Sequence, residues 1–249
     1  MPESDFTLNP TLDPAALAQT FARTRRVHIS HFLAETGAAR LFAHLKQRDD
    51  WKQVINQGEK LFELDRAAQA AMTPDTRAQF DLAVHKGARH GFQFRYETLR
   101  ISDDPVERRR SGGILDEFAL FMSSSPVLAF LQHVVGDASI DFADAQATAY
   151  GPGDFLTEHD DDVAGKSRRA AYVLGLTPDW RMDWGGLLQF RGEDGHVAEA
   201  YVPRFNSLNL FAVPAPHSVS MVAPFVPYRR YSVTGWLRAT GLHRSGGPA

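Results

Sequence analysis

The sequence of 249 residues contains no cysteine. Disulfides, thiolate zinc sites, cysteine-ligated iron–sulfur clusters and cysteine nucleophiles are therefore excluded. A metal ion would have to be held mainly by histidine, aspartate or glutamate, and these ligands favour borderline or hard ions. The chain also lacks an apolar run near the roughly 18 residues that a membrane-spanning helix needs, so we expect no membrane partner.

A strong charge of either sign is absent as well. The formal net charge is -3 and the pI ≈ 6.4, with 43% hydrophobic and 23% charged residues, which is the composition of an ordinary globular protein. This balance gives no reason to expect nucleic acid as a partner. The first residues, MPESDFTLNPTLDP, lack the basic start and apolar run of a signal peptide. We therefore expect a soluble, cytoplasmic protein.

Up to about residue 140 the pattern is mostly helical. Asp-Pro at 13–14 and Ser-Pro at 125–126 are helix start signals, because Asp and Ser accept hydrogen bonds at an N-cap and proline fits the first turn. The segment 102–113, SDDPVERRRSGG, is polar and contains two glycines, which predicts a mobile surface loop. The expected helices are Ala15–Arg23, Glu35–Gln47 and Val127–Val135.

After residue 140 the pattern changes to short strands separated by Gly, Pro, Asp and Asn. Eight such strands argue for an antiparallel sandwich or barrel. The final residues, HRSGGPA, are predicted to be disordered. The expected strands are Phe142–Tyr150, Phe155–Asp161, Ala170–Leu176, Gly186–Arg191, Val197–Val202, Ser207–Ala212, Ser218–Val222 and Tyr231–Arg238.

Among the ten histidines, His159 alone lies two residues before an acid, Asp161. Residues i and i+2 of a strand point to the same face, so both side chains could grip one ion. A neutral nitrogen and a carboxylate oxygen are two-thirds of the facial triad of non-haem Fe(II) oxygenases. His217 is the best candidate for the third ligand, because it follows a proline-rich turn at the start of an alternating segment.

Arg230 begins the strand RYSVTGWLR, thirteen residues after His217. Two histidines and an aspartate leave open positions on a metal, and a dicarboxylate that fills two of them needs a cation at its far end. The planar guanidinium of arginine pairs bidentately with a carboxylate. Arg229 competes for this role, but Arg230 shares a strand face with Ser232, whose hydroxyl could add a donor, and with Trp236.

Five segments, in their order along the chain, resemble the Fe(II)/2-oxoglutarate dioxygenases: YGPGDFLTEHDDD, RRAAYVLGLTPDW, WGGLLQF, SLNLFAVPAPHSV and RRYSVTGWLR. The likeness extends over residues 142–238 and is closer to the prolyl hydroxylase branch, including the ribosomal-protein and hypoxia-factor prolyl hydroxylases. The segment GFQFRYETLRIS (91–102) has a fainter likeness to the ribosomal-protein type.

The resemblance implies a double-stranded β-helix, a jelly-roll relative, within a single domain 1–249. Residues 1–140 would form a mainly helical support region, and residues 141–240 would form the catalytic core. It also implies Fe(II), 2-oxoglutarate and dioxygen as cofactor and cosubstrates. By the same resemblance His159, Asp161 and His217 bind iron, Arg230 binds the distal carboxylate, Tyr150 faces the cosubstrate, and Arg168 and Trp236 line the substrate side.

One residue departs from the family pattern. Relatives usually carry a tyrosine, whose hydroxyl meets the cosubstrate, where this chain has Gly175. Either another donor replaces it, with Tyr172 and Tyr150 as candidates, or the pocket is roomier than usual.

The function favoured by these observations is hydroxylation of a prolyl residue in a protein or peptide. The segment 102–113 would close over the bound chain. Hydroxylation of a free amino acid, a peptide natural product or another small molecule is the alternative within enzymes. A non-catalytic jelly-roll or cupin-like binding module is the alternative from another class, but the HxH pattern typical of cupins is absent.

Overall fold

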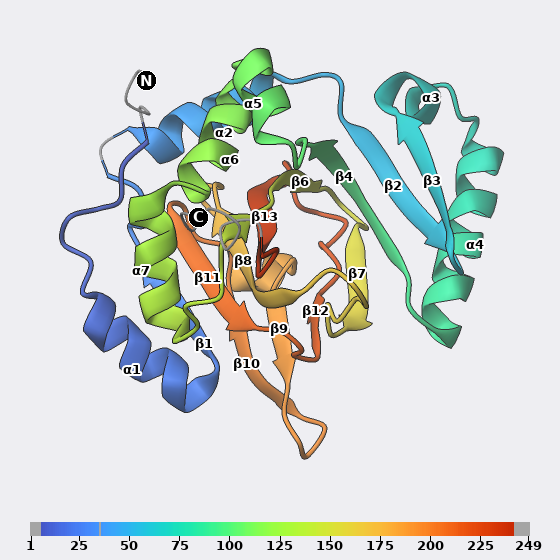
Figure 1. Ribbon diagram of the computed structural model, residues 1–249. Helices are drawn as coiled ribbons and strands as arrows, with labels where there is room; N and C mark the ends of the chain where they lie inside the picture. The colour runs from blue at the N-terminus through green and yellow to red at the C-terminus, as the bar shows by residue number, and fades with distance from the viewer. Residues whose placement is uncertain (1–5, 35, 242–249) are drawn as a thin grey trace.

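The computed structural model describes residues 6–34 and 36–241. The first residue of the expected helix at Glu35–Gln47 and the expected disordered tail therefore lie outside the described residues. Figure 1 shows a curled β-sheet in the centre, helices around one side of it, and a smaller group of elements at the opposite edge.

Thirteen strands of the described residues form one antiparallel sheet that curls on itself, which confirms the predicted jelly roll. Its main path runs β1-β11-β8-β13-β6-β4-β7-β12-β9-β10, so neighbours in space are distant in sequence. The strands before residue 140 are β1 (Arg26–Ser30), β2 (Lys52–Gln57), β3 (Lys60–Asp65) and β4 (Phe94–Arg100). Those after it are β5 (Phe142–Ala143), β6 (Gln146–Tyr150), β7 (Phe155–His159), β8 (Arg168–Gly175), β9 (Leu188–Arg191), β10 (Val197–Tyr201), β11 (Ser207–Ala212), β12 (His217–Val219) and β13 (Arg230–Arg238).

The sheet turns at β4, which pairs with β6 near its end and with β7 near its start. This turn brings β7, β12 and β9 opposite β8, β13 and β6, and the space between the two groups is the interior of the jelly roll (Figure 1). Alternation along β8 separates two environments. Ala171 and Val173 pack with Trp236 toward the interior, while Tyr172 and Leu174 belong to the large core on the outer side.

Four of the helices cover that outer side. Seven α-helices occur among the described residues, and side chains from four of them, such as Phe21, Leu41 and Phe118, pack in one core with the sheet. The Asp13 side chain accepts hydrogen bonds from the amides of Ala15 and Ala16, as the start signal predicts. The helices are α1 (Pro14–Thr24), α2 (Gly37–Gln47), α3 (Arg66–Ala70), α4 (Pro74–His90), α5 (Pro105–Ser111), α6 (Ile114–Met122) and α7 (Ser125–Val135).

The region before residue 140, which is expected to be mainly helical, also contributes four strands to the sheet. The sequence of β4 does not look like that of a strand that lies between two others, although β4 lies between β6 and β7. Its charged residues Arg95 and Glu97 are buried, with 6% and 1% of their surface exposed. Arg95 pairs with Asp154, and Glu97 pairs with Arg229. Buried charges that are paired in this way look in the sequence like an exposed polar face.

The prediction of a mobile loop at 102–113 is also wrong. Helix α5 occupies its centre and begins at Asp104-Pro105, the same start signal as at residues 13–14. Arg108 is fully buried, and its guanidinium donates to the carbonyl oxygens of Ser102 and Ala119. A segment anchored by a buried, hydrogen-bonded arginine is not free to close over a substrate.

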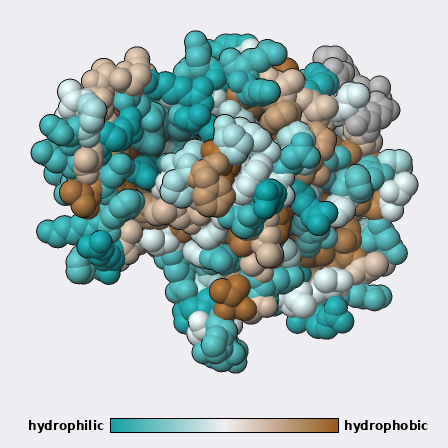
Figure 2. All heavy atoms as spheres, turned by 180° about the vertical axis from the view of Figure 1, so that it is seen from behind, coloured by the Kyte–Doolittle hydropathy of each residue, from teal (hydrophilic) through white to brown (hydrophobic). Residues whose placement is uncertain are grey.

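Hydrophobic residues on the rear face of the molecule occur in small groups among hydrophilic ones (Figure 2). Among the described residues no single helix is long and apolar enough to cross a membrane. Helices α6 and α7 reach the required length and composition only as a pair, with a bend of 54° between them.

Candidate active site

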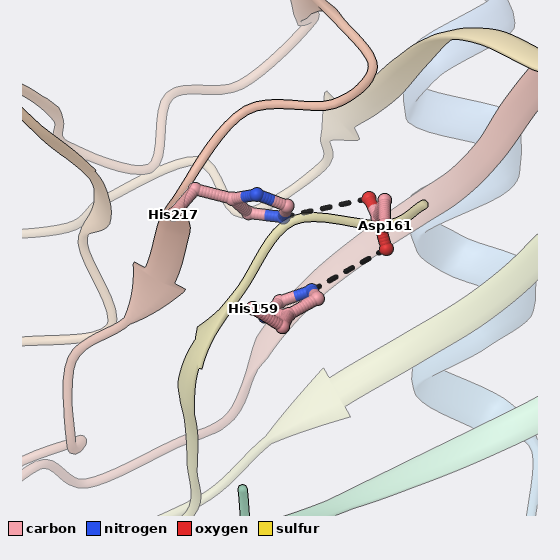
Figure 3. Close-up of side chains that lie close together, drawn as sticks. All are labelled: His159, Asp161 and His217. Carbon is pink, nitrogen blue, oxygen red and sulfur yellow. Dashed lines mark ion pairs between the residues drawn. The ribbon is translucent and has the colours of Figure 1, made fainter. Parts of the chain in front are cut away.

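Two histidines and one aspartate meet inside the jelly roll. His159 is the last residue of β7, His217 is the first residue of β12, and the two lie directly opposite each other in the strand register. The Asp161 carboxylate lies 3.4 Å from Nε2 of His159 and 3.5 Å from Nε2 of His217 (Figure 3). One ligand atom from each residue lies within 4.8 Å of the others, so the three side chains could hold one metal ion.

The convergence of His159 and Asp161 was predicted from strand alternation, but the structure brings them together differently. Strand β7 ends at His159, and Asp161 adopts a left-handed backbone with φ 64°. The turn is held in place because the Asp161 carbonyl accepts from Arg168 at 3.0 Å and the Asp160 carbonyl accepts from Ala215 at 3.2 Å. A tight turn, which costs free energy for a residue other than glycine, therefore directs this carboxylate to the histidines.

Hydrogen bonds fix both imidazoles in the form that binds metals. Nδ1 of His159 donates to the Thr157 carbonyl at 3.1 Å, and Nδ1 of His217 donates to the Ala215 carbonyl at 2.8 Å. Since a carbonyl can only accept, each Nε2 is left with its lone pair facing the cluster. Burial and the neighbouring His159 lower the pKa of His217 to about 4, so this imidazole is neutral near pH 7.

The carboxylate completes the donor set. Burial raises the pKa of Asp161, but the influence of the two neighbouring histidines outweighs burial and leaves this pKa below the ordinary value. Two neutral nitrogens and one ionised carboxylate suit a divalent ion such as Fe(II), as predicted for the facial triad.

Arg230 lies in the same cavity, which has a volume of about 360 Å³ and is also lined by the three candidate ligands. Its guanidinium is buried, and Nε and Nη1 have no hydrogen-bond partner among the described residues. Burial lowers the pKa of Arg230, and an isolated buried cation is costly. A carboxylate that accepts hydrogen bonds from the guanidinium would remove that cost. Arg229 instead points to Glu97, with Nε 2.8 Å from a carboxylate oxygen, as strand alternation predicts.

The side chain of Arg230 is held from two sides. Its guanidinium carbon lies 5.3 Å from the centre of the Tyr150 ring, which places Tyr150 in the cavity beside it. The stem packs against Gly186, where an added Cβ would lie 3.4 Å from Cδ of Arg230. The absence of a side chain at Gly186 therefore leaves space for the Arg230 stem. Its absence at Gly185 leaves space for the backbone carbonyl of Met221.

Arg168 and Trp236 line another part of the cavity. The guanidinium carbon of Arg168 lies 3.5 Å from the centre of the Trp236 indole, a close cation–π contact. The same arginine donates to the Asp161 carbonyl. Both residues thus stand next to the candidate metal ligands, and their role toward a substrate stays a prediction.

Gly175 has no free space around it. An added Cβ would lie 2.3 Å from the carbonyl oxygen of Arg204, so the pocket is not enlarged by the missing side chain. Tyr172 does not replace the missing hydroxyl either. It lies in the core on the helix side of the sheet, and its hydroxyl donates to the Asp144 carbonyl. The replacement has to come from another residue that lines the cavity.

We expect Gly175→Ala to lower the free energy of unfolding by about 1–3 kcal/mol, because the methyl group collides with backbone atoms. Gly91→Ala is the matched control, since its Cβ would meet nothing within 4 Å, and it should change stability by less than about 0.5 kcal/mol. Urea denaturation followed by circular dichroism measures both. Equal stability of the two variants would mean that the Arg204 backbone moves aside easily.

Several residues of the cavity were missed in the sequence. Among them are Phe92, Phe94, Tyr96 and Thr148. Three of them alternate in GFQFRYETLR, which is a strand signal with one aromatic face. Buried charges at Arg95 and Glu97 hid that signal. Tyr96 stacks on Tyr150 with ring centres 5.0 Å apart, and Phe92 lies 5.5 Å from the His159 ring.

A jelly roll that holds two histidines, one carboxylate and an unpaired arginine in a single cavity has the architecture of a non-haem Fe(II) oxygenase. Residues 145–238 match the 2OG-Fe(II) oxygenase superfamily. The matched segment contains all four residues.

Two curated relatives are prolyl 3-hydroxylases by name. Prolyl 3-hydroxylase OGFOD1 of Xenopus laevis is 33% identical over 153 residues, covering 59% of this chain and 29% of the relative. Prolyl 3-hydroxylase sudestada1 of Drosophila melanogaster is 30% identical over 154 residues, covering 57% and 27%. The chain spans less than a third of the length of these relatives.

Solved structures share the whole fold. A prolyl-4-hydroxylase of Pseudomonas putida has a TM-score of 0.58 at 18% identity, covering 91% of this chain and 98% of that chain. A prolyl hydroxylase of Trichoplax adhaerens, in complex with a hypoxia inducible factor oxygen degradation domain peptide fragment, has a TM-score of 0.59 at 16% identity, covering 94% and 93%. At these identities the likeness establishes the fold.

Proposed function

We propose that this protein is an Fe(II)- and 2-oxoglutarate-dependent hydroxylase of prolyl residues in a protein or peptide. One observation supports this most directly. The cavity lined by His159, Asp161 and His217 also contains the guanidinium of Arg230, two of whose nitrogens have no hydrogen-bond partner among the described residues. A metal-binding module without a cosubstrate would have no use for a buried, unpaired cation at that place.

His159, Asp161 and His217 would hold the iron, and Arg230 would pair with the distal carboxylate of 2-oxoglutarate. When bound, these groups supply the activation of dioxygen and the hydroxylation of a C–H bond. The protein orients and shields. The hydrogen bonds to Thr157 and Ala215 keep both Nε2 atoms directed at one point, and the packed stem of Arg230 fixes the far end of the cosubstrate.

The substrate class is supported by Trp236 and Arg168, which line the same cavity as Arg230. The flat indole of Trp236 can pack against a pyrrolidine ring. Arg168 can donate a hydrogen bond to a carbonyl of the substrate backbone, because its Nε has no partner among the described residues. The names of the relatives, and the peptide bound to the Trichoplax adhaerens enzyme, agree with a prolyl substrate in an extended chain.

The opening of the cavity combines exposed apolar side chains with acidic ones. Phe92 and Val163 line it with 49% and 45% of their surface exposed, and the acidic side chains of Asp160 and Asp162 stand beside them. These residues leave room for a chain that enters beside the candidate ligands, whereas α5 does not take part. A cytoplasmic location of the protein stays a prediction.

The test is incubation of the purified protein with Fe(II), 2-oxoglutarate and dioxygen. Proline-containing peptides, free proline and non-prolyl controls are scored by mass spectrometry for the gain of one oxygen atom and by succinate release. Hydroxylation of a prolyl peptide that depends on Asp161 is the expected result. Hydroxylation of free small molecules alone would favour the small-molecule alternative, and failure to bind either metal or 2-oxoglutarate would favour a non-catalytic module.

A further inference from the structure

The cavity carries a buried pair of hydroxyl groups, and one of its two members, Thr148, has no assigned role. Thr148 on β6 and Ser232 on β13 lie directly opposite each other in the register, and their hydroxyl oxygens are 2.8 Å apart. Both residues line the cavity of Arg230, and they are 2% and 0% exposed. No motif in the amino-acid sequence singles out Thr148.

The two hydroxyl groups together have one hydrogen-bond donor that has no acceptor. Each hydroxyl has one donor, and one hydroxyl donates to the other. No second hydrogen bond to either oxygen occurs within residues 6–34 and 36–241, so one donor is left over. A buried donor without a partner is costly. Arg230, which also has unpaired nitrogens, lies two residues away on the same strand face and lines the same cavity. A carboxylate bound by its guanidinium could also accept a hydrogen bond from the hydroxyl pair.

The position of the pair relates it to the missing tyrosine. In the strand register Ser232 has Gly175 on one side and Thr148 on the other. The family resemblance places a hydroxyl donor at the position of Gly175, where the Arg204 carbonyl leaves no room for a side chain. Thr148 brings a hydroxyl to the other side of the same serine. Tyr172 cannot serve, because its hydroxyl is bound to the Asp144 carbonyl.

We propose that Thr148 is a cosubstrate-binding residue. Together with Ser232 it donates a hydrogen bond to the distal carboxylate of 2-oxoglutarate, beside the guanidinium of Arg230, and so takes over the role of the absent tyrosine. This inference rests on the proposed function, since it concerns the same cavity. A carboxylate has about four lone-pair sites, enough for the arginine fork and a hydroxyl together.

The experiment compares Thr148→Val with Thr148→Ser in protein loaded with Mn(II). Valine keeps the shape of threonine but removes the hydroxyl, whereas serine keeps the hydroxyl and removes the methyl group. Isothermal titration calorimetry measures the Kd of 2-oxoglutarate. We expect Thr148→Val to raise the Kd roughly tenfold, as for loss of a hydrogen bond to a charged group, and Thr148→Ser to stay within about threefold of wild type.

Thr98→Val is the matched control. Thr98 pairs with Thr148 in the register between β4 and β6, it is also buried, and its hydroxyl donates to the Ala147 carbonyl. Removal of this hydroxyl should lower stability but leave the Kd unchanged. A wild-type Kd in Thr148→Val, or equal weakening in Thr98→Val, would overturn the assignment of Thr148.

The same titration distinguishes failure of the proposed function from failure of the role of Thr148. If the wild-type protein with Mn(II) does not bind 2-oxoglutarate at all, the proposed function fails. If the wild-type protein binds it and Thr148→Val binds equally well, the proposed function stands and the role of Thr148 is wrong.

Discussion

Asp161→Ala is expected to remove metal binding and, with it, all turnover. The carboxylate is the single negative charge of the donor set, and two neutral imidazoles alone hold a hydrated divalent cation weakly. Loss of an outer partner of a metal ligand already costs about 10- to 100-fold in affinity, so loss of the ligand itself should cost at least about 100-fold. Calorimetric titration with Mn(II) measures the effect.

Asp162→Ala is the matched control for this experiment. Asp162 is the next residue in the same acidic run and lines the same cavity, but it is exposed and does not belong to the cluster of possible ligands. Its removal should leave the affinity for Mn(II) within about threefold of wild type. Wild-type affinity in Asp161→Ala, with a circular dichroism spectrum that shows the fold intact, would take Asp161 out of the site.

The second large effect is expected on binding of 2-oxoglutarate. Arg230→Ala removes a buried, bidentate partner of a carboxylate, and such losses cost about 2–5 kcal/mol, or roughly 30- to 4,000-fold in affinity. Arg230→Lys should recover only part of this, because an ammonium group cannot form the planar fork. Equilibrium titration of the Mn(II)-loaded protein gives the Kd of each variant.

Arg229→Ala separates a role in binding from a role in stability. Arg229 is half-exposed and pairs with Glu97, which also binds Arg66 with 2.8 Å between nitrogen and oxygen. We expect this variant to unfold at a lower urea concentration but to bind 2-oxoglutarate like the wild type. If Arg229→Ala lost affinity and Arg230→Ala did not, the assignment of the two arginines would have to be exchanged.

The order of the site along the chain could be predicted from the sequence, and so could the choice between these two arginines. Alternation along one long strand separates Arg229 from Arg230, and the structure places one outside and one inside the cavity. The same rule gave the right partners for the wrong reason at His159 and Asp161. The strand ends at His159, and a left-handed residue followed by a hydrogen-bonded turn does what a strand face was expected to do. A period-two pattern of two residues cannot distinguish these conformations.

The parts that could not be predicted depend on contacts between distant strands. The sequence at Arg95 and Glu97 looks like a polar surface, because the partners Asp154 and Arg229 lie far along the chain. The hydroxyl of Thr148 can be related to the site only because the pairing of β6 with β13 places Thr148 opposite Ser232. The crowding at Gly175 depends on the backbone of Arg204, which no pattern around residue 175 indicates. The helix at 105–111, in contrast, could have been predicted from its Asp-Pro start signal. The segment was interpreted as a loop because it is rich in arginine and glycine.

The position of the two histidines on different strands bears on how the protein would respond to scarcity of metal. Strands β7 and β12 share few paired residues, and the register between them shifts after His217. A bound ion would tie the two strands together at the end of this short pairing, and binding to the folded state alone raises stability by about 2.7 kcal/mol at a metal concentration 100 times the Kd. Metal depletion would therefore loosen the pairing of these two strands and expose the chain to proteolysis, so the protein would lose abundance as well as activity.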